Sequence, residues 1–204
     1  MSSALRIYLI RHGETDLNAA RILQPPGTEL SVRGVAQAAR LARRLADVGL
    51  VRILASDLRR AEMTAEAVAR AVRAPIERDP DLAERNFGEL RGRPYAELGL
   101  DPFAPGYTPP GGESWEAFHA RVERVWVRVA AAARTAGGPI AVVTHGLVCH
   151  SVVARLARLA AGLTLDGLRW RNTSVTVLDW AGGWRVTLLD DVAHLDELSE
   201  GGAA

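Results

Sequence analysis

Two short segments place a histidine and a glycine directly after an apolar run rich in strand-forming residues. Arg11-His12-Gly13-Glu14-Thr15 follows the run at residues 5–10, and His145-Gly146 follows Ile140–Thr144. In an open α/β sheet, ligands bind beyond the carboxyl ends of the strands. Arginine offers planar, paired donors to phosphate oxygens, and a neutral imidazole can attack phosphorus and hold the phosphoryl group covalently. The two segments therefore indicate a phosphate site with His12 as a candidate nucleophile.

A third basic segment, Ser56-Asp57-Leu58-Arg59-Arg60-Ala61, follows another short apolar run and opens a helix that we expect over residues 57–72. A helix N-terminus favours anions, and an arginine in its first turn can reach the same pocket. Taken singly, Arg59 or Arg60 reads as a solvated surface residue, and Arg11-His12 reads as an ordinary loop pair. The repeated strand-end setting is what favours a shared anion site.

The elements that would position these residues alternate between strand and helix patterns. We expect strands at residues 5–10, 51–55 and 140–144, and helices at 31–47 (capped by Ser31), 57–72, 113–135 and 146–161. Residues 174–180 and 184–189 flank Ala181-Gly182-Gly183 and predict a β-hairpin. This alternation predicts an α/β three-layer sandwich with a mostly parallel central sheet and helices on both faces.

Residues 84–114 depart from this alternation. The segment is rich in proline and glycine and carries the aromatic residues Phe87, Tyr95, Phe103 and Tyr107. It is too apolar for a linker and too irregular for a helix or strand, so we expect a lid inserted over one end of the sheet. The chain is then a single domain, residues 1–204, with a tail at 198–204 that we expect to be disordered.

Net charge, cysteine count and hydrophobic patterning limit the kinds of partner and compartment that we expect. The 204 residues include 25 Lys+Arg and 24 Asp+Glu, a net charge of +1 that favours neither nucleic acid nor a membrane surface. The single cysteine, Cys149, excludes an internal disulfide. We find no leader pattern and no run near the roughly 20 apolar residues that span a bilayer. We expect a cytoplasmic protein that binds a small molecule, and the sequence carries no signal of its oligomeric state.

The ordered set of segments resembles the histidine phosphatase superfamily, whose members include phosphoglycerate mutases and small phosphatases. The resemblance runs over residues 5–195, and its most specific part is the Arg-His-Gly-Glu-Thr run at 11–15. The supporting segments, in order, are Asn18, Gln24, 56–61 with Thr64-Ala65, Glu84 with Phe87-Gly88, 110–114, 144–146, 172–174, Asp190-Asp191 and His194-Leu195.

The resemblance implies a role for each matching residue. His12 becomes the phosphate acceptor and Glu84 the proton donor, which suits chemistry in which an alkoxide must be protonated as it leaves. Arg11, Arg60 and His145 become the clamp on the phosphoryl oxygens, with Asn18 and Gln24 as further substrate-binding residues. Arg60 is chosen over Arg59 because it directly precedes Ala61. The implied activity is a metal-independent phosphomonoesterase with a phosphohistidine intermediate and no cofactor, acting on small phosphorylated metabolites.

Three departures from the family pattern affect specificity. Pro25-Pro26 replaces the glycine that usually follows Gln24, and His150 stands where relatives often carry a basic residue. The long basic, tyrosine-containing insert of phosphoglycerate mutases has no equivalent between Glu84 and Ser114, which favours a phosphatase. The aromatic lid predicts monoesters with partly hydrophobic leaving groups, unless its rings only pack the lid onto the sheet.

Other readings remain open. Phosphoglycerate mutase activity is one, and a non-catalytic phosphate-binding module on the same fold is another. Cys149 and Arg155 have the spacing of a cysteine-phosphatase loop, but the residues between them read as a buried helix rather than a glycine-rich cradle. A metal site is not expected, because His145 and His150 would face different sides of a helix and His119 and His194 lack ligand-like neighbours.

Overall fold

A seven-stranded sheet forms the centre of the protein, in the order β3-β2-β4-β1-β6-β7-β5. The computed structural model describes residues 5–198. Four neighbouring strand pairs are parallel, whereas β1–β6 and β6–β7 are antiparallel. The predicted mostly parallel sheet is therefore confirmed. Its strands are β1 (Arg6–Arg11), β2 (Arg52–Ala55), β3 (Ile76–Arg78), β4 (Ile140–Thr144), β5 (Arg158–Leu159), β6 (Val175–Trp180) and β7 (Trp184–Asp191).

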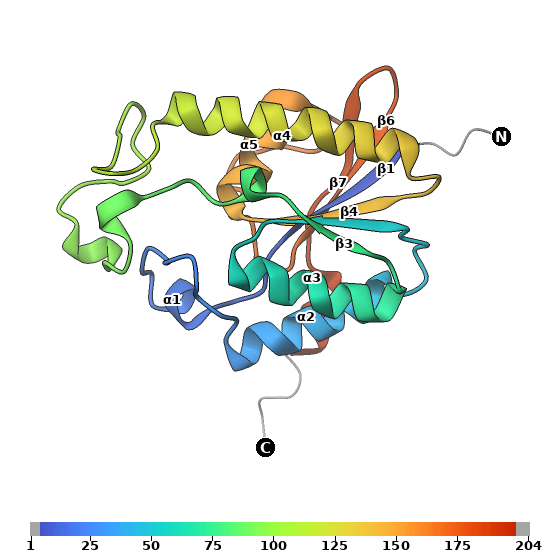
Figure 1. Ribbon diagram of the computed structural model, residues 1–204, viewed down its shortest axis with the longest axis horizontal. Helices are drawn as coiled ribbons and strands as arrows, with labels where there is room; N and C mark the ends of the chain where they lie inside the picture. The colour runs from blue at the N-terminus through green and yellow to red at the C-terminus, as the bar shows by residue number, and fades with distance from the viewer. Residues whose placement is uncertain (1–4, 199–204) are drawn as a thin grey trace.

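Helices cover both faces of the sheet, as predicted. In Figure 1, α4 (Trp115–Thr135) and α5 (Gly146–Leu156) lie on one side, and α2 (Val32–Leu45) and α3 (Arg59–Val72) lie on the other. The central strand β4 serves both layers: Ile140 and Val142 pack with α4 and α5, whereas Ala141 and Val143 pack with α2 and α3. A strand buried on both faces needs apolar residues at every position, which explains the unbroken apolar run. The first helix, α1 (Asp16–Ala19), is a single turn.

Local capping explains where two helices begin. The Ser31 hydroxyl accepts a hydrogen bond from the Gly34 backbone N–H at 3.0 Å, and the Ser114 hydroxyl accepts one from the Ala117 N–H at 3.2 Å. Each bond satisfies an N–H that has no partner within the helix. The helix predicted over 113–135 therefore begins two residues later than expected, at Trp115, directly after its serine cap.

The predicted C-terminal end of the helix after His145 is wrong. The helix expected over residues 146–161 ends at Leu156, and Ala157 already has extended backbone angles. Arg158 and Leu159 instead form β5, which pairs in parallel with Arg185 and Val186 of β7. Backbone hydrogen bonding to the edge of β7 outweighs the local helical pattern at these residues. The short strands β3 and β5 were not predicted from the sequence.

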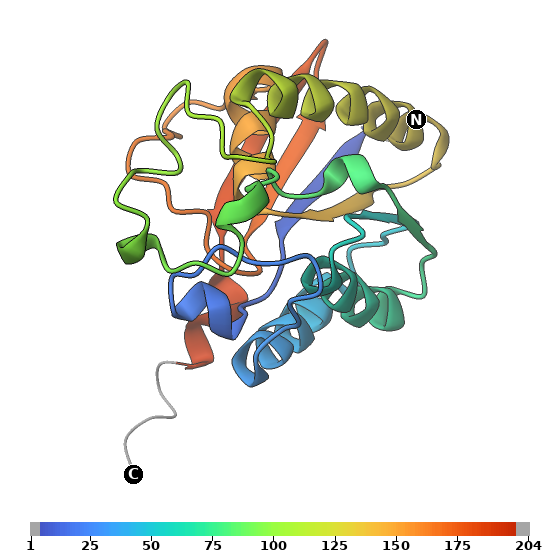
Figure 2. The same ribbon diagram turned by 60° about the vertical axis from the view of Figure 1, so that its left-hand side comes forward.

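The segment expected to form a lid lies beyond one end of the sheet, shown in green and yellow-green in Figure 2. It contains the short 3-10 helices η2 (Gly88–Leu90) and η3 (Tyr95–Glu97), and a further one, η1 (Pro80–Leu82), precedes it. Its apolar residues Phe87, Leu90 and Leu98 form a separate cluster together with Leu23 from the loop after α1. The assignment of one domain with an inserted lid stays a prediction.

After β7, η4 (Ala193–Leu198) is the last described element, and the tail expected to be disordered otherwise lies outside the described residues. Within residues 5–198, no helix has the length and apolar character needed to cross a bilayer.

Candidate active site

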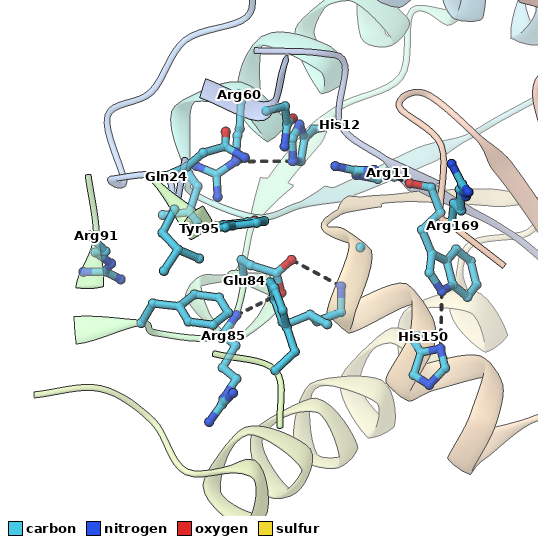
Figure 3. Close-up of a pocket in the computed structure, with 18 of the residues that line it drawn as sticks. Arg11, His12, Gln24, Arg60, Glu84, Arg85, Arg91, Tyr95, His150 and Arg169 are labelled. Carbon is cyan, nitrogen blue, oxygen red and sulfur yellow. Dashed lines mark hydrogen bonds between the residues drawn. The ribbon is translucent and has the colours of Figure 1, made fainter. Parts of the chain in front are cut away.

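A cavity of about 470 Å³ opens at the carboxyl ends of β1, β2 and β4, beneath the lid (Figure 3). Six of the seven residues expected at the site line it: Arg11, His12, Asn18, Gln24, Arg60 and Glu84. The seventh, His145, is fully buried beside the cavity, with its ring centroid 5.1 Å from that of His12. The structure therefore brings all the predicted site residues into one region.

The His12 ring is held so that Nε2 remains available. Its Nδ1 lies 2.7 Å from the Gly13 carbonyl oxygen, which can only accept, so Nδ1 carries the proton and donates. Nε2 then bears the lone pair and accepts a 3.3 Å hydrogen bond from the Arg60 Nε–H. Burial, followed by the charges of Arg60 and Arg11, holds the pKa of His12 well below its usual value. The ring is therefore a neutral imidazole at physiological pH.

Two arginines supply positive charge beside His12. Arg60 is 2% exposed, and its NH1 group donates to the Pro25 carbonyl oxygen at 3.3 Å. Burial lowers the pKa of Arg60 to about 10, so it stays protonated at neutral pH. Arg11 donates through NH1 to the Trp170 carbonyl oxygen, while its buried Nε–H has no partner among the described residues. A buried donor left without a partner is costly, and an anion in the cavity could satisfy it.

Two glycines explain how this loop packs. A Cβ on Gly13 would lie 2.8 Å from the Gly34 carbonyl oxygen, and a Cβ on Gly34 would lie 1.9 Å from the Glu14 carbonyl oxygen. The loop after β1 and the first turn of α2 therefore touch backbone to backbone. The Gly13 N–H also donates to the Thr64 hydroxyl of α3 at 3.0 Å. Gly13 therefore leaves room for the first turn of α2.

Glu84 supplies the acid group of the cavity. Among the described residues that line it, Glu84 is the one with a carboxylic acid side chain. One carboxylate oxygen accepts the Arg85 backbone N–H at 2.9 Å and the other accepts the Leu147 N–H at 3.2 Å (Figure 3). These bonds and the nearby arginines favour the charged form, but burial outweighs them and raises the pKa of Glu84. A raised pKa suits a group that must give up a proton near neutral pH.

Asn18 and Gln24 are each oriented by a neighbour. The Asn172 side-chain amide donates to Asn18 Oδ1 at 3.3 Å and to the His12 carbonyl oxygen at 3.1 Å. The Thr15 hydroxyl donates to Gln24 Oε1 at 2.8 Å. In both residues the amide oxygen is therefore engaged, which leaves the amide N–H groups free to donate to a ligand. Gln24 still lines the cavity, although Pro25-Pro26 follows it in place of the usual glycine.

The lid is tied together by Arg85. This guanidinium is 1% exposed and donates to the carbonyl oxygens of Glu113 (3.0 Å), Pro102 (3.1 Å) and Tyr107 (2.5 Å). It also lies 4.0 Å from the centre of the Trp115 ring. Although Arg85 lines the cavity, its donors are occupied by the lid backbone, so its role there is structural.

Several residues that line the cavity were not predicted as site residues. Arg91 belongs to the lid, whereas Arg169 and Trp170 belong to the loop between β5 and β6. No hydrogen bond or ion pair is described for the guanidinium of Arg91 or Arg169, so both cations are available at the cavity wall. The sequence holds no strand-end or helix-start pattern around Arg169 that could have indicated its position.

The cysteine-phosphatase reading of the sequence finds no support in the described residues. Cys149 lies within α5 and is 1% exposed, and burial raises the pKa of its thiol, so it is not in a phosphate-binding loop. Arg155 pairs with Glu123 at 2.8 Å on the surface. His150 accepts a 3.4 Å hydrogen bond from the Trp170 ring at the cavity edge. Within residues 5–198, no group of three or more potential ligands could hold a metal ion.

Comparison with known proteins agrees with this geometry. The family model described as "Histidine phosphatase superfamily (branch 1)" matches residues 7–192. A probable phosphoglycerate mutase, GpmB, from Proteus mirabilis is 32% identical over 96% of this chain and 97% of its own length.

Two solved structures show the same similarity. Bacillus stearothermophilus YhfR has a TM-score of 0.81 and 29% identity, covering 94% of this chain and 99% of its own. A mycobacterial glucosyl-3-phosphoglycerate phosphatase in complex with VO3 has a TM-score of 0.77 and 28% identity, covering 92% and 99%. The family match spans nearly the whole chain, including every residue gathered around the cavity. This chain belongs to the histidine phosphatase superfamily.

Proposed function

We propose that the protein is a metal-independent phosphomonoesterase that acts on small phosphorylated metabolites through a phosphohistidine at His12. One observation carries the proposal: a neutral imidazole, whose Nε2 lone pair faces the Arg60 guanidinium, shares a cavity with two arginines and one carboxylic acid. These are the groups that a phosphoryl transfer in two steps requires. Arg11, Arg60, His145, Asn18 and Gln24 would hold the phosphoryl oxygens.

In the first step, His12 Nε2 attacks phosphorus and the bond from phosphorus to the leaving oxygen breaks. The Arg60 guanidinium exchanges its 3.3 Å contact with Nε2 for the incoming phosphoryl oxygens. Protonated Glu84 gives its proton to the leaving alkoxide, so the product departs as an alcohol. The positive charge that develops on the His12 ring is stabilised by the Nδ1–H bond to the Gly13 carbonyl oxygen.

In the second step, water attacks the phosphohistidine. Glu84, now a carboxylate, accepts a proton from that water, and the bond from phosphorus to Nε2 breaks. Inorganic phosphate leaves, and both His12 and Glu84 return to their starting protonation states. The same carboxyl group thus serves as acid and then as base.

The choice of hydrolysis over mutase chemistry rests on the lid. A mutase must retain its intermediate, turn it round and exclude water while the phosphohistidine persists. The lid here contributes Phe87, Tyr95 and Phe103 to the cavity wall, and Arg91 as the one cation not bound to lid backbone. This wall favours a monoester with one organic leaving group. Mutase activity is the second candidate, because the relative from Proteus mirabilis carries that name.

Turnover of p-nitrophenyl phosphate in the presence of EDTA tests the proposal directly. We expect activity that survives the chelator, since Arg11 and Arg60 supply the positive charge, and complete loss in His12→Ala. Loss in EDTA that is restored by a divalent cation would overturn metal independence. No turnover at all would favour a non-catalytic phosphate-binding module. Interconversion of phosphoglycerates primed with 2,3-bisphosphoglycerate that exceeds hydrolysis would favour the mutase.

A further inference from the structure

Ser56 contacts His145 and is not itself among the residues that line the cavity. It follows β2, is fully buried, and its hydroxyl has two described partners. The Leu58 backbone N–H donates to Oγ at 3.2 Å, and His145 Nε2 lies 2.8 Å from Oγ. The other ring nitrogen, His145 Nδ1, is buried with no hydrogen-bond partner among the described residues.

The protons of this pair can be assigned by counting donors and acceptors. A serine hydroxyl has one proton and two lone pairs, and the Leu58 N–H occupies one lone pair. If His145 Nε2 carried a proton, it would occupy the second lone pair, and the Ser56 proton would have no described acceptor. If Nε2 accepts the Ser56 proton instead, both donors at Oγ are satisfied. The second arrangement leaves the imidazole proton on Nδ1.

The ring has one proton to place, not two. Burial, followed by the charges of Arg60 and Arg11, holds the pKa of His145 well below its usual value. These neighbours surround the ring from β1 and α3, and no carboxylate is described in contact with it. The imidazole is therefore neutral before substrate binds, and its tautomer depends on which partner Nε2 has.

We propose that Ser56 is a positioning residue, whose hydroxyl holds neutral His145 as the Nδ1–H tautomer so that Nδ1–H can donate to a phosphoryl oxygen. The role of His145 rests on the proposed function. The opposite tautomer would present a lone pair to an anion and repel it. Ser56 and His145 are 89 residues apart, so the pairing depends on β2 and β4 lying side by side in the sheet.

The tautomer can be measured on the wild-type protein without any variant. Two-bond ¹H–¹⁵N correlation spectra of ¹⁵N-histidine-labelled protein distinguish the two neutral tautomers. The chain has five histidines, and the signal that disappears in His145→Asn identifies the ring. We expect the Nδ1–H form at neutral pH without phosphate, and a shift toward Nε2–H in Ser56→Ala. An Nε2–H ring in the wild type would overturn the proposal.

Kinetics then test whether the tautomer matters. Removing one preorganised donor to a developing oxyanion typically lowers the rate by about 10²–10³-fold, and Ser56→Ala keeps the ring but misplaces its proton. We expect a fall in kcat/KM of roughly 10- to 100-fold and a similar weakening of vanadate binding. In a His145→Ala background, Ser56→Ala should change neither quantity by more than about twofold, because the effect acts through the ring. Effects that multiply in the double variant would contradict the proposal.

Ser151 offers a matched control. It is 1% exposed, and its hydroxyl lies 2.9 Å from Nδ1 of His119, outside the cavity that holds His12. Ser151→Ala should leave kcat/KM within about twofold, whereas a loss equal to that of Ser56→Ala would indicate a general packing effect. Wild-type turnover tests the proposed function separately. A wild type that binds vanadate without turnover would refute the phosphatase activity. The tautomer and vanadate-binding measurements would then still test the role of Ser56.

Discussion

Glu84→Gln tests the acid–base assignment by replacing a single carboxyl oxygen with an amide nitrogen. The substitution keeps the size of the side chain but removes the exchangeable carboxyl proton. Both Glu84 carboxylate oxygens accept backbone N–H groups, from Arg85 and Leu147. The amide nitrogen of glutamine must face one of these donors, so one buried N–H loses its acceptor. That loss costs about 1 to 2 kcal/mol of folding stability, a shift of a few degrees in Tm.

The effect on catalysis should be larger and should depend on the leaving group. A positioned general acid contributes about 10²–10⁴-fold, which corresponds to roughly 3 to 5 kcal/mol of transition-state stabilisation. An alkyl phosphate needs the proton because its alkoxide leaves poorly, so the variant should lose this whole factor. p-Nitrophenolate leaves without protonation, and its first step should fall by less than about tenfold.

The pH profile provides a second readout. Burial raises the pKa of Glu84, so the acid form persists above the usual range and is lost as pH rises through that pKa. Burial lowers the pKa of His12, so the neutral nucleophile is lost only at low pH. We expect kcat/KM for an alkyl phosphate to rise through the His12 pKa and fall through the Glu84 pKa, after correction for the second ionisation of the substrate near about 6.

The assay compares kcat/KM for an alkyl phosphate and for p-nitrophenyl phosphate in wild type and Glu84→Gln. The variant should lose the high-pH decline that Glu84 causes. Equal losses on the two substrates, or an unchanged high-pH limb, would refute Glu84 as the general acid.

Three further expectations concern the nucleophile, the lid and the substrate. His12→Ala should retain its fold, and rapid quench of the wild type should trap an acid-labile, base-stable adduct on His12; an adduct on Cys149, or an inactive Cys149→Ser, would contradict the nucleophile assignment. Arg85→Met should leave three lid carbonyl oxygens without their donor, lowering stability by about 3 kcal/mol and Tm by about 6 to 12 °C, and an unchanged melting curve would show that the guanidinium does not hold the lid. Phenyl phosphate should exceed fructose 1,6-bisphosphate in kcat/KM, and the reverse order would mean that the lid rings only pack against each other.

The aromatic rings of the lid pack against one another and also line the cavity. Phe87 and Tyr95 each pack edge-on against Phe103, at 5.6 and 5.5 Å between ring centres, and all three rings also line the cavity. Composition predicted an apolar lid but left open whether its rings pack or select. The structure shows that they do the first, and it places them where the second is possible. Only kinetics on matched substrates separates these roles.

Patterns of neighbouring residues were sufficient to predict the strands and helix starts that position the site. β4 has the predicted bounds because five consecutive apolar or β-branched residues suit a strand buried on both faces. Ser31 and Ser114 begin helices because their hydroxyls cap the first free N–H groups. Both effects act within a few residues, so a single sequence reveals them. The same holds for the strand–His–Gly pattern at His12 and His145.

Resemblance to a family extended the prediction to residues whose local sequence is uninformative. Glu84 lies in an irregular segment with no periodicity, and only its match to a family motif marked it. The structure explains why it needs a distant partner: its carboxylate accepts the Leu147 N–H from 63 residues away. No local rule connects the start of α5 to the second residue after η1.

Other features depended on the tertiary structure alone. Arg169 and Trp170 reach the cavity because β5 pairs with β7, a pairing that the helical pattern of residues 146–161 conceals. Asn172 supports His12 across 160 residues, and Ser56 meets His145 across 89. The sequence by itself determined five of the seven strands, the capped helices and the type of site, because these follow from neighbours along the chain. The proton positions and the cavity wall were decided by the folded chain, because buried donors and acceptors find partners through sheet order and loop packing.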